Sequence, residues 1–315
     1  ATAEPALGER DAMLSALLSP LPELLRASLS SPVDNQTLLR ESCRALERVF
    51  VRAGEAEKRI RRVVVATALE PTIGPALAAL QSRSAPAVPL LRLCRGACEG
   101  LAGECPPQLI EALVGTLVQL CSDPLSSEEG VEALVEVLRR LMRQPGRQFN
   151  SLLPGVWSLC LGDAPFNTAG GLCRSAAAPV GAAARATVLA LEALRERWDA
   201  VFPRPRQRGE PAPAPEAMAL AATTQSLIAA GGVLGAEGTT PAGVRMVLEA
   251  LSSLNKFRGL YSSAHFSGMR GAYSDALLSA AIDPRLGSAR SEVASVLFAV
   301  ASSDWAAFAA VLRAR

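Results

Sequence analysis

Histidine is nearly absent from this sequence, because His265 is the only one in 315 residues. A metal site that needs several histidines is therefore excluded, and a Ser-His-Asp or Cys-His catalytic device would have to use this single residue. Its position next to Phe266 is more typical of packing or a local hydrogen bond than of catalysis. Histidine thus gives no support for an enzyme.

Other signals of catalysis or cofactor binding are also missing. Cys94, Cys98 and Cys105 lie close enough in the chain to suggest zinc, but structural zinc sites usually show two closely spaced ligand pairs. Cysteines at helical spacing also share one helix face, so we expect buried free thiols in a reducing compartment. The glycine-bearing stretches have no following Gly-Lys-Ser/Thr, which argues against a phosphate-binding loop. We expect no enzyme activity, no cofactor and no metal.

The chain has little excess charge of either sign and no long apolar run. Its 32 basic and 30 acidic residues give a formal net charge of +2, so we expect neither nucleic acid nor a membrane as a direct partner. No stretch of about twenty residues lacks a charge, Gly or Pro, which argues against a transmembrane span. The basic clusters at 58–62 and 139–147 favour solvated helix faces over contacts with an acidic partner. Since the start, Ala1-Thr2, lacks Met and a signal pattern, we expect a fragment or a processed product.

The residues that the chain has in abundance are Ala, Leu and Val, whereas aromatic residues make up only 4%. Ala and Leu are strong helix formers, and clusters of β-branched residues suited to strands are scarce. Apolar residues recur most clearly at steps of three and four in 241–315, which predicts amphipathic helices whose stripes neighbouring helices must cover. The stripes are Val247, Leu251, Leu254 and Phe257; Met269, Tyr273, Leu277 and Ala281; Val293, Val296, Leu297 and Val300; and Trp305, Phe308 and Leu312.

The whole chain reads as about a dozen helices joined by short turns. We expect helix breaks near Pro20, after Gly54, and at Pro71 and Gly74-Pro75. The predicted fold class is all-α, an α-solenoid (superhelix) of HEAT-like helical hairpin repeats with about forty residues per pair. A compact all-α domain is the alternative. The expected divisions are HEAT-like repeats in 1–150, further helices in 151–202, a mobile Pro-rich loop in 203–215 and C-terminal repeats in 216–315.

Four stretches in the second half carry a resemblance to a known family. They are Leu153–Leu161 (Leu-Pro-Gly-Val-Trp-Ser-Leu-Cys-Leu); Leu189–Phe202, with Leu194, Trp198 and Phe202; Leu248–Lys256, followed by Tyr261 and Phe266; and Glu292, then Ala301–Trp305 and Phe308. Their order and approximate spacing across 151–315 resemble the C-terminal part of the exportins, members of the importin-β (karyopherin-β) superfamily. The first 150 residues have compatible helices but no recognisable signature.

The resemblance implies a nuclear export receptor that shuttles between nucleus and cytoplasm. Such a receptor binds protein cargo together with the GTP form of the small GTPase Ran, and it passes the pore through weak contacts with Phe-Gly nucleoporins. The main Ran-binding helices of the family lie in an N-terminal part outside this chain, and profilin–actin is the candidate cargo. A HEAT-repeat scaffold or assembly subunit unrelated to transport is the alternative.

Polar positions on one predicted helix give a hypothesis for the cargo surface. They are Glu249, Asn255, Lys256 and Arg258. In a superhelix of helix pairs, the side chains on the concave helices would meet the cargo. We therefore expect these four residues to take part in partner binding.

Overall fold

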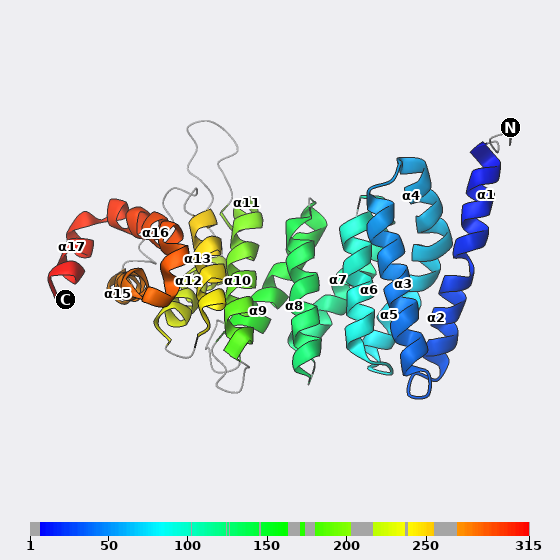
Figure 1. Ribbon diagram of the computed structural model, residues 1–315, viewed down its shortest axis with the longest axis horizontal. Coiled ribbons are helices and arrows are strands. Elements are labelled where there is room, and N and C mark those ends of the chain that lie inside the picture. Colours follow the sequence, from blue (N-terminus) through cyan, green and yellow to red (C-terminus); the bar gives the residue numbers. More distant parts are fainter. Residues whose placement is uncertain are drawn as a thin grey trace. The chain divides into compact units, whose positions relative to one another are not determined.

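The computed structural model describes residues 7–101, 103–123, 125, 127–144, 146–162, 171–173, 180–202, 217–236, 239–254 and 270–314. Helices are the only regular elements among these residues, and none of them lies in a strand (Figure 1). The predicted all-α class is therefore confirmed for this part of the chain. The chain divides into two compact units, Ala1–Leu152 and Leu153–Arg315, each described here by itself.

The helices of the first unit begin and end near several of the predicted breaks. A new helix begins at Pro20, and another ends at Gly54, as predicted. In chain order the elements are α1 (Leu7–Leu18), α2 (Pro20–Ser30), α3 (Gln36–Gly54), α4 (Lys58–Val64), η1 (Val65–Leu69), α5 (Glu70–Gln81), α6 (Ala87–Leu101), α7 (Pro107–Ser122), α8 (Glu128–Arg143) and η2 (Arg147–Leu152).

The predicted break at Pro71 and Gly74-Pro75 is wrong. The π-helical segment η1 leads directly into α5, and α5 continues past Pro75 to Gln81. Pro71 lies in the first turn of α5, where a missing backbone N–H and a fixed φ are tolerated. The hydrogen-bond pattern thus changes at η1, and the helical run does not end there.

Alternate helices of the first unit pack against one another in two groups. In the first group α6 lies between α3 and α8, and Figure 1 shows these three helices side by side. In the second group α7 packs against both α5 and η2, while α2 contacts α3 as well as α5. This arrangement is compatible with an α-solenoid.

The second unit has the same kind of packing. Its elements are α9 (Leu153–Leu161), α10 (Val180–Glu196), α11 (Trp198–Val201), α12 (Ala217–Gly235), α13 (Pro241–Leu254), α15 (Arg270–Ile282), η3 (Pro284–Ala289), α16 (Arg290–Ser303) and α17 (Trp305–Ala314). Here α13 lies between α10 and α16, whereas α12 contacts α9 and α15, and α15 contacts α17. The predicted mobile loop 203–215 lies outside the described residues.

Most of the apolar stripes predicted for 241–315 are buried. Fully or almost fully buried side chains include Val247, Leu251, Leu254, Tyr273, Leu277, Val293, Val296 and Val300. The stripe of the last helix is only partly buried, because Phe308 is 6% exposed whereas Trp305 is 65% exposed. Phe257 and Met269 lie outside the described residues.

Two helical runs are long and apolar enough to cross a membrane, judged by length and composition alone. They are Lys58–Gln81, of 24 residues, and Met218–Gly235, of 18 residues. The bent pair Pro284–Ser303 and Trp305–Ala314 would add a third if it formed one span. The composition of these two runs therefore does not argue against a span, contrary to expectation, and 56% and 50% of their most apolar windows are buried within the chain.

Candidate functional site

The candidate site is a cluster of charged side chains on α3, α6 and α8. Glycines determine how closely two of these helices pack. A Cβ added at Gly54 would lie 2.8 Å from the Cα of Gly100, and one added at Gly96 would lie 3.0 Å from the Cα of Glu47. A Cβ on Gly100 would overlap the backbone carbonyl of Phe50. The backbones of α3 and α6 therefore approach each other along a seam that admits no side chain at these positions.

Helix α8 packs less extensively on the other side of α6, and its start is well defined. The hydroxyl Oγ of Ser127 accepts a hydrogen bond from the backbone N–H of Gly130, at 3.1 Å. Glu128 and Glu129 follow in the first turn, and arginines occupy the last turn. This charge order, acidic at the start and basic at the end, favours the helix dipole.

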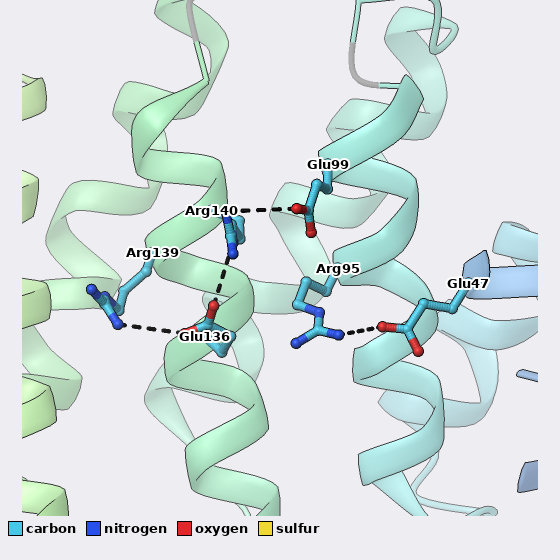
Figure 2. A network of polar contacts seen from close by, with 6 residues as sticks. All are labelled: Glu47, Arg95, Glu99, Glu136, Arg139 and Arg140. Carbon is cyan, nitrogen blue, oxygen red and sulfur yellow. Dashed lines mark hydrogen bonds and ion pairs between the residues drawn. The ribbon is translucent and has the colours of Figure 1, made fainter. Parts of the chain in front are cut away.

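Ion pairs connect the three helices across their outward side (Figure 2). Arg95 of α6 pairs with Glu47 of α3, whose side chain is only 14% exposed. Arg140 of α8 pairs with Glu99 of α6 at 3.7 Å and with Glu136 of its own helix at 3.3 Å. The Arg95–Glu47 and Arg140–Glu99 pairs join neighbouring helices, whereas the Arg140–Glu136 pair lies within α8.

A groove of about 220 Å³ lies between α6 and α8. Its lining is mostly charged and consists of Leu91, Arg92, Arg95, Glu129, Glu132, Ala133 and Glu136. Close packing of α6 on α3 and looser packing on α8 account for its position. A charged groove on the outward side of a helical layer can hold polar side chains of another protein, but it offers no nucleophile paired with a base.

The predicted cargo-contacting residues lie in the second unit, and the structure describes only one of them. Glu249 is exposed on α13, where its carboxylate pairs with Arg245 Nε at 3.0 Å. A partner that bound this carboxylate would have to displace Arg245 from it. Asn255, Lys256 and Arg258 lie outside the described residues, as does His265.

The cysteines proposed as an alternative zinc site are held as neutral thiols. Burial raises the pKa of Cys94 to about 12 and that of Cys105 to about 11. The pKa of Cys98 is also raised, by burial first and then by the neighbouring Cys94 and Cys105. Zinc and electrophiles react with the thiolate, which these environments disfavour at neutral pH. All seven cysteines are free thiols.

No group of three His, Cys, Asp or Glu side chains in the described ranges is arranged to hold a metal ion. The polar surface of α3, α6 and α8 is thus the site with the most developed side-chain arrangement in those ranges. Sequence analysis missed it. The signal that could have revealed it is the Gly96-x-x-x-Gly100 spacing, which predicts close contact with another helix.

Comparison with known proteins adds no assignment: neither the protein-family models nor the curated proteins contain a match to this chain.

Proposed function

We propose that this chain is a protein-binding helical-repeat array and, more specifically, the C-terminal arch of a nuclear export receptor of the importin-β superfamily. The observation that carries the proposal is the packing of alternate helices in both units, α3–α6–α8 in the first and α10–α13–α16 in the second. Stacked HEAT-like hairpins produce this pattern, because each pair buries its apolar faces against the next pair.

Such an array suits a carrier for physical reasons. Each stacked pair presents one helix face outward, so successive pairs build an extended surface that can follow a large protein. Small adjustments at each interface sum to opening or closing of the arch, which allows cargo to be bound and released. Among helical-repeat arrays, the exportins are favoured because four stretches of the second half resemble theirs in the same order.

Within that class the chain resembles exportin-six, whose cargo is profilin–actin. We infer that the chain binds protein cargo cooperatively with Ran-GTP and contacts Phe-Gly nucleoporins while it shuttles between nucleus and cytoplasm. Ran-GTP would bind mainly to a part of the protein outside these residues. Catalysis, cofactors, nucleic acid and membranes have no role in this proposal. A HEAT-repeat scaffold independent of transport is the second candidate, because the same packing of alternate helices supports it equally.

Dependence on the nucleotide state of Ran separates the two candidates. The full-length protein is used to retain partners from extract of its own cells, with Ran locked in the GTP form or in the GDP form. An export receptor is expected to retain cargo only with the GTP form, and immunoblotting for actin and profilin tests the candidate cargo. The same partners in both states would refute the transport proposal and leave the scaffold.

The cargo surface is tested in the same assay. Reversing the charges of Lys256 and Arg258 together (Lys256→Glu with Arg258→Glu) is expected to weaken retention of cargo, as is Glu249→Lys. A matched control is Arg290→Glu, because Arg290 is exposed on α16, whereas the described residue Glu249 is exposed on α13. Unchanged cargo retention in the double variant would remove Lys256 and Arg258 from the proposed surface.

A further inference from the structure

The first unit carries a concentration of positive charge that the net charge of the chain conceals. The segment Arg40–Arg62 contains eight basic residues and four acidic ones, a net charge of +4, whereas the whole chain has +2. Much of this charge lies on α3, where Arg40, Arg44 and Arg48 follow at steps of four and are all exposed. Residues four apart lie on adjacent turns of one helix side, so the three guanidinium groups form a continuous stripe.

A fourth arginine, Arg92 of α6, extends the stripe sideways. Gly96 of α6 meets Glu47 of α3, and Gly100 meets Phe50, so the two helices run parallel, with Glu47 paired to Arg95. Arg44 lies three residues before Glu47, and Arg92 lies three residues before Arg95, which places the two arginines at about the same level on neighbouring helices. Arg92 is exposed and also lines the groove. We call Arg40, Arg44, Arg48 and Arg92 the arginine row.

The charges of the arginine row are hardly neutralised within the chain. Among the described residues no hydrogen bond or ion pair engages Arg40, Arg48 or Arg92. Arg44 has only a long contact of 4.0 Å to Glu41, and both side chains are more than half exposed. Like charges four residues apart destabilise a helix, so the row does not serve the stability of α3. Arg95 and Arg140 on the same surface, by contrast, both form ion pairs with glutamates.

We propose that the arginine row binds an acidic segment of a partner protein. A guanidinium group donates two parallel hydrogen bonds to a carboxylate, and several such pairs in a row fix the register of the bound segment. The proposal deepens the partner-binding role proposed above, and it rests on protein binding rather than on transport.

The chemistry of the surroundings favours carboxylates over a nucleic acid. The three arginines of α3 span eight residue steps, or about 12 Å of helix, which matches a short acidic segment. No aromatic side chain belongs to the row for bases to stack on. Beyond Arg92 the groove presents Glu129 and Glu132, which would repel a phosphate backbone that continued in that direction. Carboxylates of a protein segment can end before these glutamates.

The test uses the intact chain and a fluorescently labelled peptide of alternating glutamate and glycine as the probe. Fluorescence anisotropy measures its affinity for the wild type and for the triple variant Arg40→Gln, Arg48→Gln and Arg92→Gln. We expect the triple variant to bind at least about tenfold more weakly, since each lost charged pair contributes substantially. Raising the salt concentration should also weaken wild-type binding. The corresponding peptide with glutamine in place of glutamate should not bind.

A second triple variant, with the same loss of three positive charges elsewhere in the first unit, tests whether binding depends on the arginine row or on overall charge. Arg26→Gln, Lys58→Gln and Arg62→Gln also remove three exposed cations from the first unit, outside the row. Far-UV circular dichroism and thermal unfolding verify that both triple variants are folded. Affinity close to that of the wild type in this control supports the proposal. Equal weakening in both variants, or no binding of the peptide to the wild type, would overturn it.

A single-stranded and a double-stranded DNA oligonucleotide are measured in parallel. The proposal would be refuted if either oligonucleotide bound the wild type more tightly than the peptide does and the triple variant of the arginine row lost that binding. The arginine row would then be a nucleic-acid site. Failure here would leave the Ran-dependent retention of cargo unaffected, because that assay scores nucleotide dependence and uses the unmutated protein. The two proposals can therefore fail separately.

Discussion

The backbone carbonyl of Phe50 occupies the space that a Cβ on Gly100 would need. Helices α3 and α6 can therefore approach closely only because position 100 has no side chain, and Gly54 and Gly96 extend the same seam. The ion pair between Glu47 and Arg95 lies along this contact. The close approach of α3 and α6 thereby determines where the polar surface of the first unit is placed.

Replacing Gly100 with alanine should destabilise the first unit by about 1–3 kcal/mol or more, because the new methyl group forces two backbones apart. Urea denaturation followed by far-UV circular dichroism measures the loss. Gly115→Ala in α7 is the matched control, since a Cβ there meets nothing within 4 Å. That substitution should raise stability by up to about 1 kcal/mol through helix propensity. Similar effects of the two substitutions would contradict the close packing of α3 and α6.

The two interhelical ion pairs should differ in their contribution to stability. Glu47 is 14% exposed and Glu99 is 38% exposed, whereas their partners Arg95 and Arg140 are similarly exposed, at 35% and 37%. Glu47→Gln should therefore lower the free energy of unfolding by about 1–2 kcal/mol, since it removes a charged hydrogen bond from a mostly buried position. Glu99→Gln should change it by less than about 1 kcal/mol. Equal losses in urea denaturation would show that burial does not govern these pairs.

Asp304 has two separate roles at the start of α17, and two substitutions can separate them. Its Oδ1 accepts a hydrogen bond from the backbone N–H of Ala307 at 3.1 Å, and its other oxygen pairs with Arg270, whose side chain is 11% exposed. Asp304→Asn should keep the cap and lose the ion pair, at about 1–2 kcal/mol. Asp304→Ala should cost about 1 kcal/mol more, because the cap is lost as well. Thermal unfolding of both variants measures the difference, and equal melting temperatures would contradict the capping role.

Alkaline pH should destabilise the first unit through its buried thiols. Burial raises the pKa of Cys43, Cys94 and Cys121 to about 12, compared with about 9 for an exposed thiol. Between these values the unfolded chain loses its thiol protons while the folded chain keeps them. Stability from this source is fully present below pH of about 9 and falls as the pH rises toward about 12.

Denaturation at several pH values measures this dependence, and Cys94→Ala provides the comparison. The variant should be less stable at neutral pH, because a buried side chain is shortened, but its stability should fall less steeply above pH of about 9. Identical slopes in the wild type and the variant would exclude Cys94 as a source of the alkaline loss. Labelling with a thiol reagent at neutral pH should be slow in the folded protein and rapid after unfolding.

Sequence reasoning predicted local structure well wherever local chemistry decides it. Pro20 begins a helix and Gly54 ends one, as predicted. It failed at Pro71 and Pro75, because a π-helical segment carries the helix into α5 with Pro71 in the first turn. Proline in a sequence does not reveal whether the preceding residues can change their hydrogen-bond pattern.

The candidate site was less accessible to such reasoning. The residues expected to contact cargo were chosen along one helix of the second unit, and only Glu249 among them is described by the structure. The arginine row needs two helices in a known register, which the sequence does not supply. The four-residue spacing of Arg40, Arg44 and Arg48 can be read from the sequence. Their proximity to Arg92 follows only from the pairing of Glu47 with Arg95.

The sequence by itself determined that this protein is helical, because Ala and Leu dominate and apolar residues recur at steps of three and four. It also determined helix ends such as those at Pro20 and Gly54, since caps and breakers act within a few residues. Only the tertiary structure decided which helices lie side by side, where α3 meets α6 without side chains between them, and which arginines remain unpaired. These features depend on contacts between residues almost fifty positions apart, such as Glu47 and Arg95, and no local pattern encodes such contacts.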